Sequence, residues 1–575
     1  MKKFDKKQVI WIACGILIGL LIIVCFIIAA REKNISDIDI HDVSANDISL
    51  EYRDTTYGSS IELDDADISV GGNYHVSGSF ECIHVDTTKA VQLVLDGADI
   101  SCSNGPAIYV EDADSVRIVL KGENSVKATT TADLDGAVYS KDDLIFSGDG
   151  SLVVESNYDG IVSKDTLVFD SGTYEIHSGD DGIRGKDNVA IVDGKYTIYS
   201  SGDGIKSTNE EDTNLGNIVI DDGEFIIQSK NDAIQAITYL NINGGSYDIT
   251  TADGYQSTLA NSVSAKGFKS DGQVVIKGGK ATFNTADDSV HSNGSIAIIG
   301  GTIQISTGDD GVHADEALQI SDGSIEISHC NEGLEAHLIQ IQGGNIDIVA
   351  EDDGLNGTSS TNVRGIGGRS DGKIIISGGV VKAVSGGDGI DCNGTIEMIG
   401  GTVYTESSNR AAETALDHDS TFTMTGGTLI AVAVSSGAND IGAKTSSVPM
   451  LIAGVSQSSG TIRLGTITYE PTIQNYTYII IASSELSAGD YTLSYGSNST
   501  SVTLKNGTTT VGNTNSGMGG NPGGRQHSTR ESEQPTPDDD NRTNPNEGQD
   551  VPEAPSGEAN TPQTPRDGHE PPSRH

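Results

Sequence analysis

Aromatic residues are scarce in this 575-residue chain: they make up 5% of it, and tryptophan occurs once. A β-propeller, whose blades carry periodic aromatic motifs, is therefore a poor fit. Basic residues are also few, with 35 Lys and Arg against 82 Asp and Glu. Nucleic acid is excluded as a partner, because phosphate binding needs clustered basic side chains. The formal charge of −47 suits a solvated extracellular surface or one that collects cations.

Cysteine is too rare for a disulfide-rich scaffold, with six residues in the whole chain. Two of them lie in an apolar run near the N-terminus and are expected to be thiols inside a membrane. Cys82 and Cys102 are 20 residues apart, close to the repeat length described below, so they are placed to pair on neighbouring coils. Cys330 and Cys392 fall at different positions of the repeat and are expected to be free.

Charged residues are absent from residues 9–30, VIWIACGILIGLLIIVCFIIAA. As a helix this run is roughly 33 Å long, which is enough to cross a bilayer core. Four lysines precede it, against Arg31 and Lys33 after it, so residues 1–8 are expected to stay in the cytoplasm. The sequence predicts a single-pass membrane anchor with the bulk of the chain extracellular. A cleaved signal and a secreted protein are the alternative.

Proline is nearly confined to the C-terminus, where ten of the 13 prolines lie between Pro522 and Pro572. Such a composition buries too little apolar surface to order itself, so residues 511–575 are predicted to be a disordered tail. Outside the anchor no stretch keeps a helical period without glycine, which argues against an α-helical body.

What the chain has in abundance is glycine, 71 residues, in a repeat of about 22 residues. The repeat is clear in DDGIRGKDNVAIVDGKYTIYS (Asp180–Ser200), DDSVHSNGSIAIIGGTIQIST (Asp287–Thr307) and DDGVHADEALQISDGSIEIS (Asp309–Ser328). Equivalent turn positions are assigned to Gly160, Gly182, Gly204, Ala233, Gly254, Ser289, Gly311, Gly333, Gly354 and Gly389. The longer intervals are interpreted as loop insertions at 208–216, 257–272 and 358–372.

Each repeat holds three short strands with alternating apolar residues, which predicts an all-β parallel β-helix with one repeat per coil. Stacked coils then share one Ile/Val/Leu core. We expect residues 31–84 to be a linker and N-terminal β cap, and residues 85–435 to be the β-helix. Residues 436–510 lose the rhythm and are expected to form antiparallel strands, either as a C-terminal cap or as a small β module.

Acidic residues align at the turn of each coil. Two full charges about 4.8 Å apart repel by roughly 3–4 kcal/mol at an effective dielectric near 20, so such a column needs cations, protons or amines. Calcium, which takes oxygen ligands, is the predicted cofactor, although the EF-hand spacing is missing. The alternative is a plain Asp-Gly turn, with glycine at positive φ and aspartate bonding its own backbone. The candidate metal ligands are Asp180, Asp181, Asp203, Asp287, Asp288, Asp309, Asp310, Asp352 and Asp353.

Polar side chains form a second column, three residues after the acidic one, in which Gln256 is expected to follow Gln235. A row of lysines is expected beside this column. Such lines of long polar side chains fit a linear polysaccharide, and the basic end suits anionic sugars. The alternatives are a solvated strand face and, for the histidines, neutral hydrogen-bonding imidazoles. The candidate substrate-binding residues are Lys141, Lys164, Arg184, Lys186, Lys206, Gln235, His291 and His313.

Several blocks closely resemble the bacterial β-helical carbohydrate-binding domain family, typified by a cellulose- and pectin-binding clostridial protein. They are SKDDL (Ser140–Leu144), DDGIRGKD (Asp180–Asp187), GDGIKSTNEED (Gly202–Asp212), DDSVHSNG (Asp287–Gly294) and DDGVHADEAL (Asp309–Leu318). The resemblance implies a right-handed parallel β-helix of pectate-lyase shape, calcium between coils at aspartate turns, and binding of polysaccharides, acidic ones included. Asn231-Asp232-Ala233, Asn331-Glu332 and Tyr158-Asp159 depart from the pattern.

Three functions are open on the sequence alone. Calcium-dependent β-elimination needs a base such as Arg or Lys beside a calcium-bound uronate, and Arg184 and Lys206 near Asp180 and Asp181 suit that chemistry. However, a catalytic site normally interrupts a repeat with unique residues, whereas these acids recur in every coil. The predicted function is therefore polysaccharide binding, with a lyase as the alternative, a structural adhesin as the third, and no catalytic residue assigned.

Overall fold

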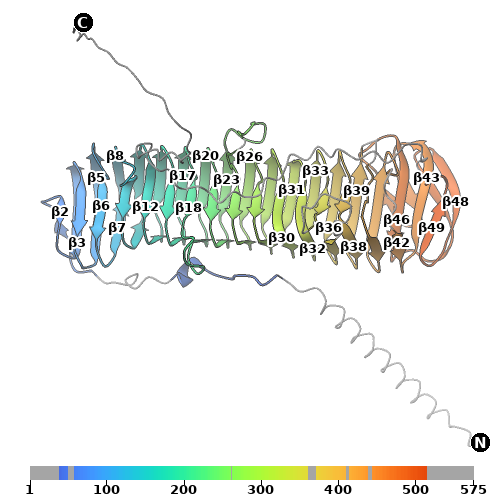
Figure 1. Ribbon diagram of the computed structural model, residues 1–575, viewed down its shortest axis with the longest axis horizontal. Helices are drawn as coiled ribbons and strands as arrows, with labels where there is room; N and C mark the ends of the chain where they lie inside the picture. Colours follow the sequence, from blue (N-terminus) through green and yellow to red (C-terminus); the bar gives the residue numbers. More distant parts are fainter. Residues whose placement is uncertain are drawn as a thin grey trace, which may run out of the picture. The chain divides into compact units, whose positions relative to one another are not determined.

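The computed structural model describes residues 38–48, 57–260, 262–359, 371–408, 413–437 and 443–514. These residues form β-strands joined by turns, apart from the short 3₁₀ helix η1 (Ala45–Asp47). Successive coils stack along one axis (Figure 1). No helix within the described ranges has the length and apolar character needed to cross a membrane. The predicted anchor at 9–30 lies outside those ranges, as do residues 515–575 of the tail predicted at 511–575. Val511 is the last residue of a strand, so the ordered part of the chain extends past the predicted limit of 510.

Three parallel ladders run along the stack, and each coil adds one strand to each ladder. The first ladder holds β2 (Asp67–Ile68), β4 (Ile83–Asp86), β6 (Ile108–Asp112), β9 (Gly136–Ser140), β12 (Asp159–Ser163), β15 (Ile183–Gly185), β18 (Ile205–Ser207), β21 (Ile234–Ala236), β24 (Phe268–Ser270), β27 (Val290–Ser292), the starts of β30 (Val312–Ile320) and β32 (Leu334–Ile341), β34 (Leu355–Gly357) and β37 (Ile390–Cys392).

The second ladder begins one corner later in each coil. It holds β1 (Ile61–Glu62), the starts of β3 (Gly72–Phe80) and β5 (Val91–Cys102), β7 (Val116–Lys121), β10 (Leu144–Gly148), β13 (Thr166–Phe169), β16 (Asn188–Ile191), β19 (Asn217–Ile220), β22 (Tyr239–Ile242), β25 (Gln273–Ile276), β28 (Ser295–Ile298), the ends of β30 and β32, β35 (Gly372–Ile376), β38 (Gly394–Met398), β40 (Thr421–Met424) and β42 (Ala443–Ser446).

The third ladder closes each coil. It holds the ends of β3 and β5, β8 (Glu123–Ala128), β11 (Ser151–Ser156), β14 (Thr173–Ser178), β17 (Lys195–Ser200), β20 (Glu224–Ser229), β23 (Ser246–Thr251), β26 (Lys280–Thr285), β29 (Thr302–Thr307), β31 (Ser324–His329), β33 (Asn345–Ala350), β36 (Val380–Ser385), β39 (Thr402–Ser407) and β41 (Thr428–Ala433).

This is the coiled arrangement expected from the repeat, and its right-handedness stays a prediction. The stack extends beyond the predicted limits of 85 and 435. β1 pairs with β3 and β2 with β4, both in parallel, and β40 pairs with β42 in parallel. A disulfide joins Cys82 to Cys102 on neighbouring coils, while Cys330 and Cys392 are buried free thiols.

Aromatic rings form a continuous stack inside the third ladder. Tyr174, Tyr196, Phe225 and Tyr247 follow one another in register, with ring centroids 5.1, 4.8 and 4.8 Å apart. The hydroxyl of Tyr196 donates a hydrogen bond to the carbonyl of Asp193 in the preceding turn (3.1 Å). Stacked coils thus let these four rings pack face to face.

The Tyr196→Phe variant is expected to lower the free energy of unfolding by about 1 kcal/mol, because the ring stack remains and only one buried hydroxyl bond is lost. Denaturant unfolding measures this change. Tyr199→Phe is the matched control, because the Tyr199 side chain is 38% exposed. Equal losses of unfolding free energy in the two variants would contradict a stabilising role for the Tyr196 hydrogen bond.

Antiparallel strands complete the C-terminal end. β46 (Tyr476–Ser483) pairs antiparallel with β41 and with β43 (Met450–Ser458), and β43 pairs parallel with β49 (Thr508–Val511). A separate antiparallel sheet has the order β45 (Ile467–Tyr469), β44 (Ile462–Leu464), β47 (Gly489–Tyr495) and β48 (Asn498–Leu504). The buried carboxylate of Glu406 accepts hydrogen bonds from the amides of Thr472 (2.9 Å) and Ile473 (2.8 Å), which ties this region to the coils.

Candidate functional site

Small residues follow the acidic residues at the corner where each coil enters the first ladder. A Cβ atom on Gly182 would lie 2.5 Å from the carbonyl oxygen of Gly204 on the next coil and 2.6 Å from the Ile198 side chain. Gly160, Gly182 and Gly204 are not among the residues with positive φ. The plain-turn interpretation was therefore wrong about the cause: glycine is needed here because consecutive coils approach closely.

The acidic residues before these glycines hydrogen-bond from coil to coil rather than within their own turns. Oδ1 of Asp181 accepts the amide of Asp203 at 2.8 Å, and the same contact recurs along the column. The other contacts of this kind are Asp181 to Asp159 (3.0 Å), Asp232 to Asp203 (2.9 Å), Asp310 to Asp288 (2.9 Å), Glu332 to Asp310 (3.1 Å) and Asp388 to Asp353 (2.6 Å), the amide being named first. We call this set the corner column.

Cations neutralise the corner column in the N-terminal coils. The Arg184 guanidinium lies 2.6 Å from Oδ2 of Asp159 and 2.6 Å from Oδ2 of Asp135. Burial would lower the pKa of Arg184, but Asp159 and Asp135 outweigh it and raise this pKa. Arg184 is thus held as a cation inside the protein, which removes it as a general base for an elimination reaction.

Lys206 and Lys269 repeat this arrangement on later coils. Nζ of Lys206 lies 3.0 Å from Oδ2 of Asp203, and Nζ of Lys269 lies 3.1 Å from Oδ2 of Asp232. The two lysine side chains are 16% and 10% exposed, and Gln235 between them is buried. The structure therefore places three predicted substrate-binding residues, Arg184, Lys206 and Gln235, against the corner column rather than on an open surface.

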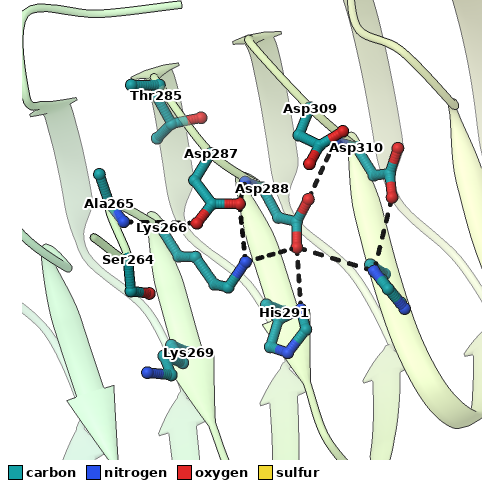
Figure 2. A network of polar contacts seen from close by, with 12 residues as sticks. Ser264, Ala265, Lys266, Lys269, Thr285, Asp287, Asp288, His291, Asp309 and Asp310 are labelled. Carbon is teal, nitrogen blue, oxygen red and sulfur yellow. Dashed lines mark hydrogen bonds and ion pairs between the residues drawn. The ribbon is translucent and has the colours of Figure 1, made fainter. Parts of the chain in front are cut away.

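One coil breaks the corner column with a lysine, and Figure 2 shows the network that results. Lys266 occupies the corner position, and its Nζ lies 2.7 Å from Oδ1 of Asp287 and 2.8 Å from Oδ2 of Asp288. On the next strand, Nδ1 of His291 lies 2.9 Å from Oδ2 of Asp288. His313 lies one coil further, with Nδ1 3.4 Å from Oδ2 of Asp310.

Charge within this network is divided unevenly. Burial disfavours the charged form of Asp288, yet Lys266 and His291 outweigh it and hold the pKa of this carboxyl well below its usual value. In contrast, burial and then the charges of Asp310 and Asp288 raise the pKa of Asp309 to about 8. Asp287, Asp288 and Asp309 have carboxylate oxygens within 4.8 Å of one another, so an ammonium occupies the edge of a set that otherwise resembles a cation site.

Carboxylates dominate the C-terminal coils. Burial and then the charge of Asp310 raise the pKa of Glu332 to about 8, and burial and then Asp391 raise that of Asp388 to about 9. Ligand atoms of Asp310, His313 and Glu335 lie within 4.8 Å of one another, as do those of Asp388, Asp391 and Asp417. The second group offers only oxygen, which is the donor that calcium takes, whereas imidazole suits transition metals better.

The remaining predicted metal ligands differ in placement. A Cβ on Gly202 would lie 2.5 Å from Oδ1 of both Asp180 and Asp181, so these two carboxylates flank the same turn. Asp352 and Asp353 flank Gly387 in the same way, at 2.4 and 2.5 Å. Asp203 is engaged by Lys206, as described above. Among the described residues, none of these five belongs to a group of three close ligands.

A row of lysines lies at the C-terminal ends of the first-ladder strands, whereas the corner column lies at their N-terminal ends. The row spans three consecutive coils. Lys141, Lys164 and Lys186 each follow the last residue of β9, β12 and β15, whose strands pair in register. The side chains of Lys141 and Lys186 are 45% and 41% exposed. Nζ of Lys141 lies 5.7 Å from the ring centre of Tyr109, and Nζ of Lys164 lies 5.6 Å from that of Tyr139.

One coil was assigned wrongly from the sequence. The turn expected at Gly254 lies at Gly267, since Phe268 pairs with Ile234 and with Val290. Lys269 therefore takes the place given to Gln256, and the side chain of Asp253 is 83% exposed beside Lys230 instead of lying in the corner column. The insertion precedes the first ladder here, and the match between GIKS (Gly204–Ser207) and GFKS (Gly267–Ser270) was the missed signal.

Fold and site together define an all-β protein of stacked coils with a buried acidic column along one ladder. A family model described as "Carbohydrate-binding domain-containing protein" matches residues 64–311 and 310–521, which is more than half of the chain, and the chain belongs to this family. An Acetivibrio thermocellus protein with the same description is 28% identical over 161 residues, which cover 25% of this chain and 56% of that protein. The chain thus spans about half the length of this curated relative.

A solved structure is also similar in part. It is titled "Structure of the polysaccharide lyase-like protein from C. thermocellum, Gadolinium derivative", and it has 28% identity and a TM-score of 0.32 to this chain. The match covers 32% of this chain and 81% of that one.

Proposed function

We propose that this protein binds an anionic polysaccharide of the pectin type along the first-ladder side of its coils, cellulose being a second ligand to test. The observation that carries the proposal is the lysine row, Lys141, Lys164 and Lys186. These lysines stand about 4.8 Å apart from coil to coil, on a chain whose formal charge is −47. A linear polymer with one carboxylate on each sugar matches such a row.

Two kinds of cation lie along the first ladder. Arg184, Lys206 and Lys266 neutralise internal carboxylates. In the lysine row, Lys141 and Lys186 reach solvent and pair only with exposed acids, Glu111 at 3.5 Å and Glu211 at 3.8 Å. Exposed ion pairs are weak, so a polyanion is able to compete for these lysines. Arginine and lysine held in buried ion pairs are poor general bases, so non-catalytic binding is favoured over a calcium-dependent lyase. A structural adhesin remains the outcome if no polysaccharide binds.

Calcium enters the proposal at the C-terminal coils. Asp388, Asp391 and Asp417 would hold it with oxygen ligands, and the bound ion would supply the positive charge that Arg184 and Lys206 supply on earlier coils. The side chain of Thr414 follows Asp388 at the corner, and its buried hydroxyl has no hydrogen-bond partner among the described residues. In the proposed location, residues 9–30 anchor the protein in the cell membrane with the coils outside.

The triple variant Lys141→Ala, Lys164→Ala, Lys186→Ala is expected to bind polygalacturonate at least about tenfold more weakly, and wild-type binding is expected to weaken as salt is raised. Binding is measured by retention on the insoluble polymer and by calorimetry. A matched control, Lys127→Ala, Lys195→Ala, Lys280→Ala, removes the same charge from the third ladder.

Equal binding by the two triple variants would contradict the role of the lysine row. Release of unsaturated uronides, which absorb in the ultraviolet, would instead establish a lyase. Binding to other copies of the protein alone would favour the adhesin.

A further inference from the structure

Residues 38–48, here called the strap, lie along the outer side of the second ladder (Figure 1). The amide of Ile38 donates a hydrogen bond to Oε1 of Gln319 on β30 (3.0 Å). Seven residues later, the amide of Ala45 donates to Oδ1 of Asp221 after β19 (3.0 Å), and the Ser44 hydroxyl donates to its Oδ2 (2.8 Å). The strap thus crosses the coils in the direction opposite to their order in the chain.

Side-chain amides hold the backbone of the strap between these ends. Gln273 accepts the amide of His41 (2.9 Å) and donates to the carbonyl of Asp39 (2.9 Å). Asn241 donates to the carbonyl of His41 (2.6 Å). Amides that donate and accept in alternation act like the edge of a neighbouring strand, so this surface recognises an extended peptide through its main chain.

Apolar contacts fix the position of the strap. Ala45 is fully buried and Ile48 is 9% exposed, and both pack in one cluster with outward-facing residues of the second ladder. Those residues are Ile145, Val168, Ala190 and Val219. The ring of His41 stacks on Tyr239 with centroids 5.3 Å apart, and Asp42 forms an ion pair with Lys277. Ala45 and Ile48 thus extend the contact of the strap to apolar residues on the N-terminal side of β19.

The strap has the length that this path requires. The coils from β30 to β19 are four steps apart, or about 19 Å at roughly 4.8 Å a step. Seven residues in extended conformation span at most about 25 Å. After the strap, Tyr57 lies at the N-terminal coils, where its hydroxyl donates a hydrogen bond to the carbonyl of Val91 on β5 (3.5 Å).

We propose that the outer side of the second ladder is a peptide-docking surface whose occupant is the strap of the same chain. The chain from the N-terminus to residue 48, here called the leader, is joined covalently to the coils through the residues that precede β1. The strap then attaches the leader a second time, without a covalent bond, to the coils between β19 and β30. This attachment holds the coils even when the chain between the strap and β1 is cut. Docking of the strap does not depend on polysaccharide binding.

The test uses the full chain with an affinity tag at the N-terminus and a specific protease site in place of residues 51–54. After complete cleavage, the fraction of the coils that is captured through the tag is measured. The coils of the otherwise unaltered protein are expected to stay with the tagged leader. The double variant Asp221→Ala, Asn241→Ala removes four hydrogen bonds to the strap and is expected to lower the captured fraction by about tenfold or more.

The matched control is Asp248→Ala, Gln304→Ala, which changes the same residue classes on the third ladder. Hydrogen exchange in the uncut protein separates undocking from misfolding. The amides of Ile38, His41 and Ala45 are expected to be protected in the unaltered protein. In the Asp221 and Asn241 variant they are expected to lose protection while amides of the coils keep it. Immediate release of unaltered coils, or capture that survives the double variant, would overturn the proposal. Capture of an uncut, untagged second copy would show docking between copies and would overturn the same-chain assignment.

Discussion

The Lys266→Ala variant is expected to lower the free energy of unfolding by about 3–5 kcal/mol, because the loss of one partner leaves buried charge uncompensated. Nζ of Lys266 contacts both Asp287 and Asp288, and the Asp288 side chain is 4% exposed. No solvent shell is available to replace the ammonium at that depth. The change is measured by denaturant unfolding in the presence of EDTA.

Lys195→Ala is the matched control for this variant. Lys195 also forms an ion pair, with Glu224, but the two side chains are 61% and 68% exposed. An exposed pair of this kind contributes about 0–1 kcal/mol. A loss below about 1 kcal/mol in Lys266→Ala would mean that Asp287 and Asp288 are neutralised by something other than the ammonium.

Lys266→Ala should also acquire a dependence on calcium that the unaltered network lacks. With the ammonium gone, Asp287, Asp288 and Asp309 present three carboxylates with oxygens within 4.8 Å. We expect calcium to restore part of the lost stability in this variant, and magnesium to restore less, since it demands stricter geometry. The same calcium titration on the Lys195→Ala control should show no such gain.

The stability of the calcium-free protein is expected to fall as pH rises from about 4 to about 9. The pKa of Glu332 is raised to about 8 and that of Asp388 to about 9, while their unfolded values are near 4. A carboxyl with a raised folded-state pKa keeps its proton longer in the folded state, so its contribution is complete below pH 4 and is lost up to pH 9. Thermal unfolding in EDTA across this range measures the effect.

Calcium is expected to reverse this trend, because it replaces the protons with a stronger positive charge once the carboxylates ionise. At a calcium concentration a hundred times the dissociation constant, the gain is about 2.7 kcal/mol, and it should be larger at pH 8 than at pH 5. Asp388→Asn keeps an acceptor for the amide of Thr414 but should lose part of the gain. Asp248→Asn, on the third ladder, is the control.

Two results would contradict this metal assignment. One is a melting temperature that EDTA and calcium leave unchanged at pH 8. The other is a calcium-free stability that rises with pH between 5 and 9, which would mean that the carboxyls of Glu332 and Asp388 are stabilised in their charged forms by protein groups.

The coil architecture was predictable because its cause is local and repeated. An interval of 22 residues places Val290 on Val312, His291 on His313 and Ser292 on Ala314, and the observed pairing follows that register. Alternation along each strand then decides which side chains face the core. An insertion defeats this reasoning when its edges are ambiguous, as at Gly254 and Gly267.

The pairing between the two polar columns was not predictable in the same way. The register places Asp203 under Asp232 and Lys206 under Gln235, but it does not say that a side chain bends toward its neighbour three residues away. That choice depends on burial, since an open Lys206 would prefer water and a nearly buried one needs Asp203. The strap was missed for another reason: it carries no repeat, and its partners lie about 180–280 residues away.

The antiparallel strand β46 has a consequence for association between molecules. A stack of parallel coils presents an unpaired strand edge at its end, onto which the coils of another molecule are able to add. At the third ladder that edge belongs to β41, and β46 occupies it in the opposite direction. Pairing then passes through β43 to β49, a strand of four residues. The edge of β41 is thereby closed to a strand of another molecule, which suits a protein whose repetitive sequence would otherwise favour polymerisation.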